Sequence, residues 1–555
     1  MPSVLLLRWT SILFASVVLA ACGGGGGGSS AAPVAAPVAA TPPPAPGQTA
    51  PAQPAPQTPP PAAPAPALAP APAPAPNPQL AQPDNLDTTL RALINREGLT
   101  GDAARNRTLP NINEPLAALG KKLFFSKSLG GDFDAACVSC HHPALGGSDD
   151  LSLPVGIGAT DPDRLGSGRT HAATGLPNVP RNSSSVFNMG LFDSGLFWDS
   201  RVESFGKEPE ANGSRSDIRT PDVAFGAADP NAGDNLPAAQ ARLPVASDTE
   251  MRGTRFEAGN NNAAVRAHLA ARIGGYGIGA GELSVNTWLP EFQAAFGAGT
   301  AQQLITFDRI AEALAAYERS MNFSNHPFAN YVRGNLQVLN DPQKRGAILF
   351  LRDQNEGGGG CIDCHSGDRF TDEEPHTVAF PQFGPGKGDG NAHDFGRERE
   401  SGLAADRYRY QTPSLLNVEV TAPYGHAGAY ETLGHVLAHY NNPNGTVTNF
   451  FDDGGACTLN QFQNRADCAN LYPTSRGSSN AALRKLQQER ADNTTEFPNT
   501  DLNNGQRADI VAFLNTLTDP CVESRTCLAP WIADTTNQGP DNQQLNARDA
   551  EGNLL

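Results

Sequence analysis

The chain has 555 residues and a formal net charge of −17, with an isoelectric point near 5.1. This acidity argues against nucleic-acid binding and against a basic patch that would hold the protein on a membrane surface. The length allows two sizeable domains once the low-complexity N-terminal part is set aside.

Residues 1–22 have the features of a lipoprotein signal peptide. A short apolar run leads into Leu19-Ala20-Ala21-Cys22, and such a run is typical of a cleaved export signal rather than a membrane span. The tetrapeptide resembles a bacterial lipobox, in which the cysteine carries the lipid; an ordinary signal peptide is the alternative. We therefore expect a lipid-anchored protein of a Gram-negative bacterium that faces the periplasm. The outer membrane is favoured, because Gly23 stands where an inner-membrane retention signal has aspartate.

Residues 23–85 consist almost wholly of Gly, Ala and Pro. Such a stretch cannot bury enough apolar surface to offset its ordering entropy, so we expect a disordered tether. The remaining chain is expected to be mainly α-helical. We place a first domain at 86–335, a second domain at 336–535 and a polar tail at 536–555.

Two C-x-x-C-H motifs occur in the chain: Cys137-Val-Ser-Cys140-His141 and Cys361-Ile-Asp-Cys364-His365. In this arrangement two thiols bond to the haem vinyl groups, and the adjacent imidazole binds the iron from the proximal side. A zinc or thiol-redox site is the alternative, but a histidine directly after each cysteine pair is the haem signature. The sequence therefore predicts two covalent haems c, with the motif histidines as proximal iron ligands.

The same pattern precedes each motif. Apolar spacing in Leu116-x-x-Leu119-Gly120-x-x-Leu123-Phe124 predicts an amphipathic helix before the first motif. Gly346-x-x-Leu349-Phe350 repeats its phase before the second motif. This internal repeat predicts two cytochrome-c-like helical domains with long loops and little strand.

The iron of the second haem needs a distal ligand if it is six-coordinate. Methionine is common there, but none follows His365 in the sequence. The best local candidate lies in 431–440, where Tyr440 shares one helical face with two leucines and a valine. Tyr440 is thus expected to point toward the core, and an ordinary core aromatic is the alternative. His435 and His439 fall on the opposite face, and His439 is the second candidate ligand.

Four further cysteines remain, at 457, 468, 521 and 527. An even number in an exported chain favours disulfides. The local pairs Cys457–Cys468 and Cys521–Cys527 are preferred, although spacing alone leaves the connectivity open.

Several further motifs join the haem motifs in a pattern that resembles the bacterial di-haem cytochrome c peroxidases and the related MauG-type enzymes, over roughly residues 108–520. These motifs are Arg181-Asn182, Phe187-Asn188, Phe197-Trp198-Asp199-x-Arg201, Thr249-Glu250-Met251, Thr412-Pro413-Ser414-Leu415-x-Asn417-Val418 and Thr421-Ala422-Pro423-Tyr424-x-His426. Ser183-Ser184 departs from the usual Ala-Pro.

The resemblance implies a peroxidatic first haem, on His141, with an open distal side. Glu250 matches the family's distal glutamate, which moves a proton during O–O cleavage; a solvated loop carboxylate is the alternative. Trp198 matches the tryptophan between the two haems, where it would bridge electron transfer as well as fill the core. The methionine position of the peroxidases falls on Tyr440, and tyrosine there is the MauG-type pattern.

The resemblance also implies a calcium site between the domains. Asn182, Thr421 and Pro423 match its ligands, one side-chain amide oxygen and two backbone carbonyls, which are hard donors suited to Ca²⁺. No acidic cluster marks this site, so the residues themselves do not predict it.

The implied function is that of a cytochrome-c peroxidase-type oxidoreductase, which reduces hydrogen peroxide at the His141 haem with electrons relayed through Trp198 from the His365 haem. Its donor would be a small periplasmic cytochrome c or cupredoxin. A MauG-type oxidase that modifies a partner protein by long-range electron transfer is the alternative. A non-catalytic di-haem electron carrier and a di-haem dioxygenase acting on a polymer are further alternatives. Membrane contact is expected only through the lipid anchor.

Overall fold

The computed structural model describes residues 86–254, 256–257, 261–390, 393–495, 497 and 500–555. All of these residues belong to one compact unit. The predicted signal peptide, lipobox and tether lie outside the described residues. Within the described part, no helix has both the length and the apolar character that crossing a membrane requires.

The described residues are mainly helical, as the sequence predicts. The α-helices are α1 (Leu86–Arg96), α2 (Pro115–Phe124), α3 (Leu236–Gln240), α4 (Asn262–Gly274), α5 (Trp288–Phe296), α6 (Ala301–Leu304), α7 (Phe307–Ser320), α8 (Pro327–Val332), α9 (Asp341–Leu351), α10 (Glu398–Ser401), α11 (Leu433–Asn441), α12 (Pro443–Asp452), α13 (Ser475–Ala491), α14 (Asn504–Leu514) and α15 (Arg525–Leu528). Short 3-10 turns and long loops connect them.

Strands are few and short. The strands β1 (Gly195–Leu196), β2 (Val202–Ser204) and β3 (Ile218–Arg219) form an antiparallel sheet in that order, with Leu196 opposite Val202 and Glu203 opposite Arg219. The strands β4 (Pro375–His376) and β5 (Tyr410–Gln411) form a second antiparallel pair.

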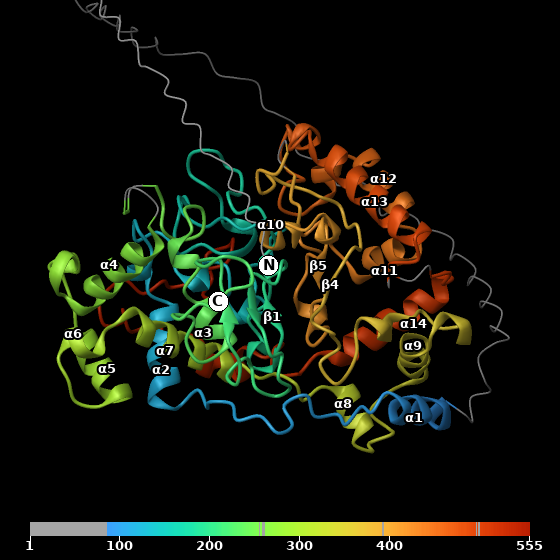
Figure 1. Cartoon of the computed structure of the whole chain (residues 1–555), viewed down its shortest axis with the longest axis horizontal. Helices are drawn as coiled ribbons and strands as arrows, with labels where there is room; N and C mark the ends of the chain where they lie inside the picture. Colours follow the sequence, from blue (N-terminus) through green and yellow to red (C-terminus); the bar gives the residue numbers. More distant parts are fainter. Residues whose placement is uncertain (1–85, 255, 258–260, 391–392, 496, 498–499) are drawn as a thin grey trace, which may run out of the picture. The chain divides into compact units, whose positions relative to one another are not determined.

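Two helix crossings repeat the same close contact. Helix α2 packs across α7, and α9 packs across α14 (Figure 1). A Cβ atom placed on Gly120 would lie 1.9 Å from the carbonyl oxygen of Ala313, and one on Gly346 would lie 1.9 Å from that of Asp509. Only glycine permits these approaches. The two glycines of the predicted repeat therefore occupy equivalent positions.

Capping residues explain where the second pair of helices begins. The side chain of Asn340 accepts a hydrogen bond from the backbone N–H of Gln343 at 3.1 Å, and Pro342 stands in the first turn of α9. Asn503 caps α14 in the same way through the N–H of Gln506, at 3.0 Å.

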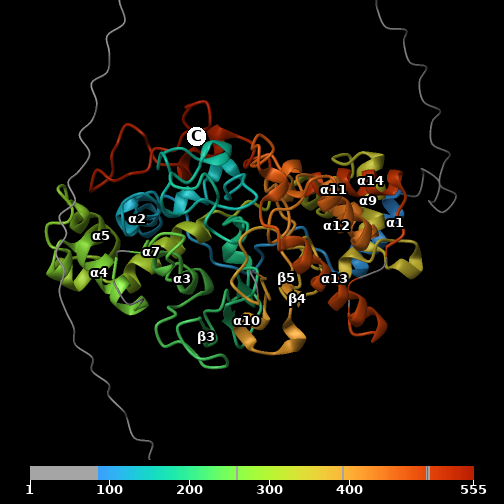
Figure 2. The same cartoon turned by 90° about the horizontal axis from the view of Figure 1, so that it is seen from above.

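Two large buried clusters hold the unit together. The first surrounds α2, α3, α4 and α7 and also includes Leu545 and Ala547 from the end of the chain. The second surrounds α9 and α14 and includes α1 from the start of the described chain (Figure 2). Each cluster therefore contains residues far apart in sequence, and the predicted domain limits stay a prediction.

Both preferred disulfides are confirmed. Cys457 pairs with Cys468 and Cys521 pairs with Cys527, with Cα atoms 5.0 Å and 5.2 Å apart. The four cysteines of the C-x-x-C-H motifs are unpaired.

Candidate redox site

Both C-x-x-C-H motifs line one internal cavity. Its volume is about 380 Å³, within the ~300–1,000 Å³ of an ordinary small-molecule pocket. All six motif residues line it: Cys137, Cys140, His141, Cys361, Cys364 and His365. Tertiary structure thus brings two motifs that are more than 200 residues apart in the sequence onto one space.

Both motif histidines are held through Nδ1. In His141 this atom lies 3.2 Å from the carbonyl oxygen of Gly147 and 3.3 Å from Oγ of Ser183. In His365 it lies 3.0 Å from the carbonyl oxygen of Phe370. A hydrogen bond at Nδ1 orients the ring and leaves Nε2 as the nitrogen that could bind iron.

Burial also prepares these side chains for metal and thioether chemistry. It lowers the pKa of His365 and lowers that of His141 to about 4, so both rings are neutral, which is the form that binds a metal. It raises the pKa of the Cys137, Cys140 and Cys361 thiols. Unpaired cysteines beside oriented, neutral imidazoles fit a covalently attached haem at each motif.

The first motif is close to Glu250. This side chain lines the cavity. The pKa of the Cys140 thiol is raised mainly by burial, then by the charge of Asp149, and to a smaller extent by the charge of Glu250. Gln240, at the end of α3, is buried and lines the same cavity, and its Oε1 has no hydrogen-bond partner among the described residues. Sequence reasoning missed Gln240, because no local pattern distinguishes it from a surface glutamine.

In the sequence, Ser183 stands out only as a departure from the family pattern. Its hydroxyl donates to the carbonyl oxygen of Cys140 at 2.7 Å and also lies beside Nδ1 of His141. The contact spans 42 residues of sequence, so no local signal could have revealed it.

Trp198 and the three candidate calcium ligands line the cavity as well. The indole N–H of Trp198 donates to the backbone carbonyl oxygen of Asn182 at 3.0 Å. The side-chain N–H of Asn182 donates to the carbonyl oxygen of Leu151, also at 3.0 Å. Thr421 and Pro423 lie much later in the sequence and line the same cavity. The peptide bond between Ala422 and Pro423 is cis.

Near the second motif, Tyr440 lines the cavity and His439 does not. The expectation that His439 lies on the helix face away from the core is wrong, because its side chain is fully buried. Its Nε2 lies 2.9 Å from the carbonyl oxygen of Val378, and its Nδ1 lies 2.8 Å from the hydroxyl of Tyr430. Both ring nitrogens of His439 therefore have protein partners, whereas Tyr440 faces the cavity.

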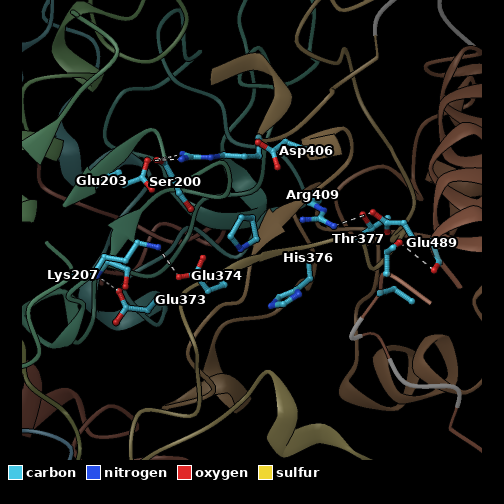
Figure 3. A pocket seen from close by; sticks show the side chains of 15 residues that line it. Ser200, Glu203, Lys207, Glu373, Glu374, His376, Thr377, Asp406, Arg409 and Glu489 are labelled. Carbon is cyan, nitrogen blue, oxygen red and sulfur yellow. Dashed lines mark hydrogen bonds and ion pairs between the residues drawn. The ribbon is translucent and has the colours of Figure 1, made fainter. Parts of the chain in front are cut away.

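A polar pocket adjoins the cavity at the second motif. Among the residues that the structure describes, His376 alone lines both spaces. Figure 3 shows the ion pairs of Lys207 with Glu374 and of Arg409 with Glu489 on the pocket wall. The ring of His376 is held by Asp372, with Nε2 2.8 Å from the carboxylate. The pocket is thus a charged, solvent-facing approach to the second motif.

The chain is similar in sequence to several known proteins. Residues 114–337 match the family model described as di-haem cytochrome c peroxidase. The methylamine utilization protein MauG of Methylorubrum extorquens is 26% identical over 360 residues, which cover 63% of this chain and 78% of that protein. The cytochrome c551 peroxidase of Pseudomonas aeruginosa is 26% identical over 366 residues, which cover 65% of this chain and 81% of that protein.

Among solved structures, the di-haem peroxidase BthA of Burkholderia thailandensis is 22% identical with a TM-score of 0.44; the match covers 77% of this chain and 89% of that one. The family model includes the first C-x-x-C-H motif, and the sequence relatives extend across most of their own length. Residues 114–337 thus match the di-haem cytochrome c peroxidase family, and the similar proteins include both a MauG protein and a cytochrome c551 peroxidase.

Proposed function

We propose that this protein is a periplasmic di-haem peroxidase, which reduces hydrogen peroxide at a haem held by His141 with electrons that enter through a haem held by His365. The observation that carries the proposal is the shared cavity, because one internal space is lined by both motifs and by Glu250 and Trp198. Cys137 and Cys140 would anchor the first haem, and Cys361 and Cys364 the second.

Different residues that line the cavity would serve proton transfer and electron transfer. A bound haem iron would supply the redox chemistry and the site for peroxide. Glu250 would take a proton from one peroxide oxygen and return it to the other, a general acid–base role that its place beside the first motif supports. Trp198 would provide the aromatic bridge between the haems, held in place by Asn182.

A MauG-type oxidase acting on a partner protein is the second candidate. Two observations favour it: Tyr440 faces the cavity at the second motif, and no methionine follows His365 in the sequence. Tyrosinate ligation would stabilise oxidised iron, whereas methionine stabilises the reduced state. Tyr440 would be the distal ligand of the second haem under either function.

Calcium and the membrane anchor complete the proposal. Asn182, Thr421 and Pro423 would bind one Ca²⁺, a role supported by their common place on the cavity and by the resemblance. A lipid on Cys22 would tether the catalytic unit to the outer membrane, where a small cytochrome c or cupredoxin would deliver electrons.

Steady-state peroxide reduction with a reduced small cytochrome c tests the function, together with EPR spectroscopy of the resting ferric protein. We expect turnover, one high-spin haem and one low-spin haem. Negligible turnover with peroxide still consumed would favour the MauG-type oxidase. If both irons stay six-coordinate in every redox state, both enzyme functions are excluded and only a non-catalytic electron carrier remains.

A further inference from the structure

A second carboxyl group reaches the cavity near the first motif. Glu318 lies on α7, one turn beyond Leu314, and both side chains line the cavity. The residue is only 4% exposed, and its Oε2 has no hydrogen-bond partner within the described structure. An unpaired buried carboxylate is costly, so Glu318 must be neutral or must meet a partner in the cavity.

Burial raises the pKa of Glu318 to about 8, so the group is a carboxylic acid at neutral pH. The elements packed against α7 include α2, α3, α4 and the 3-10 turn η6 (Met189–Leu191). Neither α3 nor η6 has a charged residue. The charged side chains of α2 and α4 have other partners: Lys121 with the carbonyl of Pro530, Lys122 with Glu291, Arg266 with Asp222, and His268 and Arg272 with Glu282.

The titratable groups that do face Glu318 are uncharged. They are the thiol of Cys137 and the phenol of Tyr317, whose pKa values are raised by burial and then by Glu318 itself. Among the described residues no ion pair joins Glu318 to a cation, and the adjacent Arg319 donates instead to the carbonyl oxygen of Thr108 at 3.1 Å. The site therefore favours the protonated form.

Two other polar side chains, Gln240 and Glu250, line the same cavity as Glu318. Helix α3 packs against α7 and ends at Gln240, whose buried Oε1 also lacks a partner in the part of the chain that the structure describes. Glu250 follows ten residues later on the same cavity. Two carboxyl groups, Glu250 and Glu318, thus line the cavity that passes the first motif, an arrangement suited to acid–base chemistry.

The reaction itself calls for a second acid. Reduction of hydrogen peroxide to two waters breaks the O–O bond and consumes two electrons and two protons. The transfer that Glu250 would perform moves a proton from one peroxide oxygen to the other and consumes none. The protons that are consumed must reach the cavity from solvent through another group.

We propose that Glu318 is a second proton-carrying residue of the first haem pocket, which gives its proton to the oxygen atom that remains after O–O cleavage and is then reprotonated from solvent. The inference rests on the proposed peroxidase function, in which a one-electron donor protein supplies both electrons. It assigns to α7 a catalytic residue that sequence reasoning did not single out.

Replacing Glu318→Gln in the haem-loaded protein tests this role, because the amide keeps the shape and cannot deliver a proton. We expect peroxide turnover to fall by about 10²-fold or more, the usual contribution of a general acid. Wild-type turnover should decline as pH rises through about 8, and the variant should lack that limb. Glu312→Gln is the matched control, since Glu312 is exposed on the same helix. Unchanged turnover and an unchanged pH profile would overturn the proposal.

A second measurement keeps the test independent of peroxide turnover. Reduction of a buried haem favours uptake of a proton by a nearby group. The reduction potential of the first haem should therefore fall as pH rises near 8. The slope should be at most about 59 mV per tenfold change in proton concentration. That dependence should vanish in Glu318→Gln and persist, displaced in pH, in Glu318→Asp. The same slope in all three proteins would refute the role of Glu318. An inactive wild type that keeps the slope would refute only the peroxidase function.

Discussion

Trp198 donates its indole N–H to the backbone carbonyl oxygen of Asn182, and the N–H of Asn182 donates in turn to the carbonyl oxygen of His426 at 2.9 Å. The aromatic ring proposed to bridge the haems is therefore fixed by the segment proposed to bind calcium. Electron transfer depends on a rigid relative placement of its groups, and this chain of hydrogen bonds provides it.

Trp198→Phe should slow electron transfer between the haems while both haems stay attached. The variant loses the large indole ring and one hydrogen bond, so the free energy of unfolding should also fall, by about 1 kcal/mol. Rapid-mixing spectroscopy would follow reduction of the first haem after the second. Trp531→Phe is the control, because Trp531 has an equivalent bond to Ser320 at 3.0 Å but does not line the cavity. Equal rates in the two variants would exclude the bridge.

Tyr440→Phe should change the low-spin EPR signal of the second haem and leave the high-spin signal intact. The reason is that Tyr440 faces the cavity at the second motif. In contrast, His439→Gln should lower the free energy of unfolding by about 1–3 kcal/mol, through lost buried hydrogen bonds, without altering either signal. The reverse pattern would make His439 the ligand.

Acid should weaken the protein through the buried pair of Arg181 and Asp394. Burial acts to raise the pKa of Asp394, but the charge and hydrogen bonds of Arg181 outweigh it and lower the pKa to about 2. A carboxyl with a depressed folded-state pKa contributes stability above its unfolded value, near 3.8, and loses that contribution as pH falls toward 2. About 2 kcal/mol of unfolding free energy should therefore disappear over this range.

Asp394→Asn should remove that acid dependence and lower the unfolding free energy at neutral pH by about 3 kcal/mol, since it breaks a buried ion pair. Denaturant titrations at several pH values measure both effects. Asp467→Asn, at an exposed ion pair with Arg465, is the control and should change neither. An acid transition that survives in Asp394→Asn would place its origin elsewhere.

Removing the Cys457–Cys468 disulfide by a double Cys→Ser replacement should lower the unfolding free energy by about 3 kcal/mol. The reason is that the crosslink closes a loop in the unfolded chain and so reduces its conformational entropy. The Cys521–Cys527 pair closes a shorter loop, and its removal should cost about 2 kcal/mol. Neither replacement should alter the haem spectra. A spectral change after loss of Cys457 and Cys468 would show that this region shapes the haem pocket.

Much of the architecture could be predicted from the chain because its signals are local. Apolar spacing predicts α2 and α9, and the structure gives Gly120 and Gly346 the same role at two helix crossings. Both disulfides join cysteines close in sequence. His439 was placed on the wrong side because its helix is covered on more than one face, a fact that only packing partners such as Val378 and Tyr430 reveal.

The sequence by itself determined the chemistry of attachment, since two thiols and an imidazole within five residues define a haem site without reference to the rest of the chain. Only the tertiary structure decided which distant groups complete that site: Ser183 beside His141, and the buried Gln240 and Glu318, each with an oxygen that has no partner within the described structure. The physical reason is that the protonation state and partners of a polar group depend on burial, and burial is created only when segments far apart in the chain pack together.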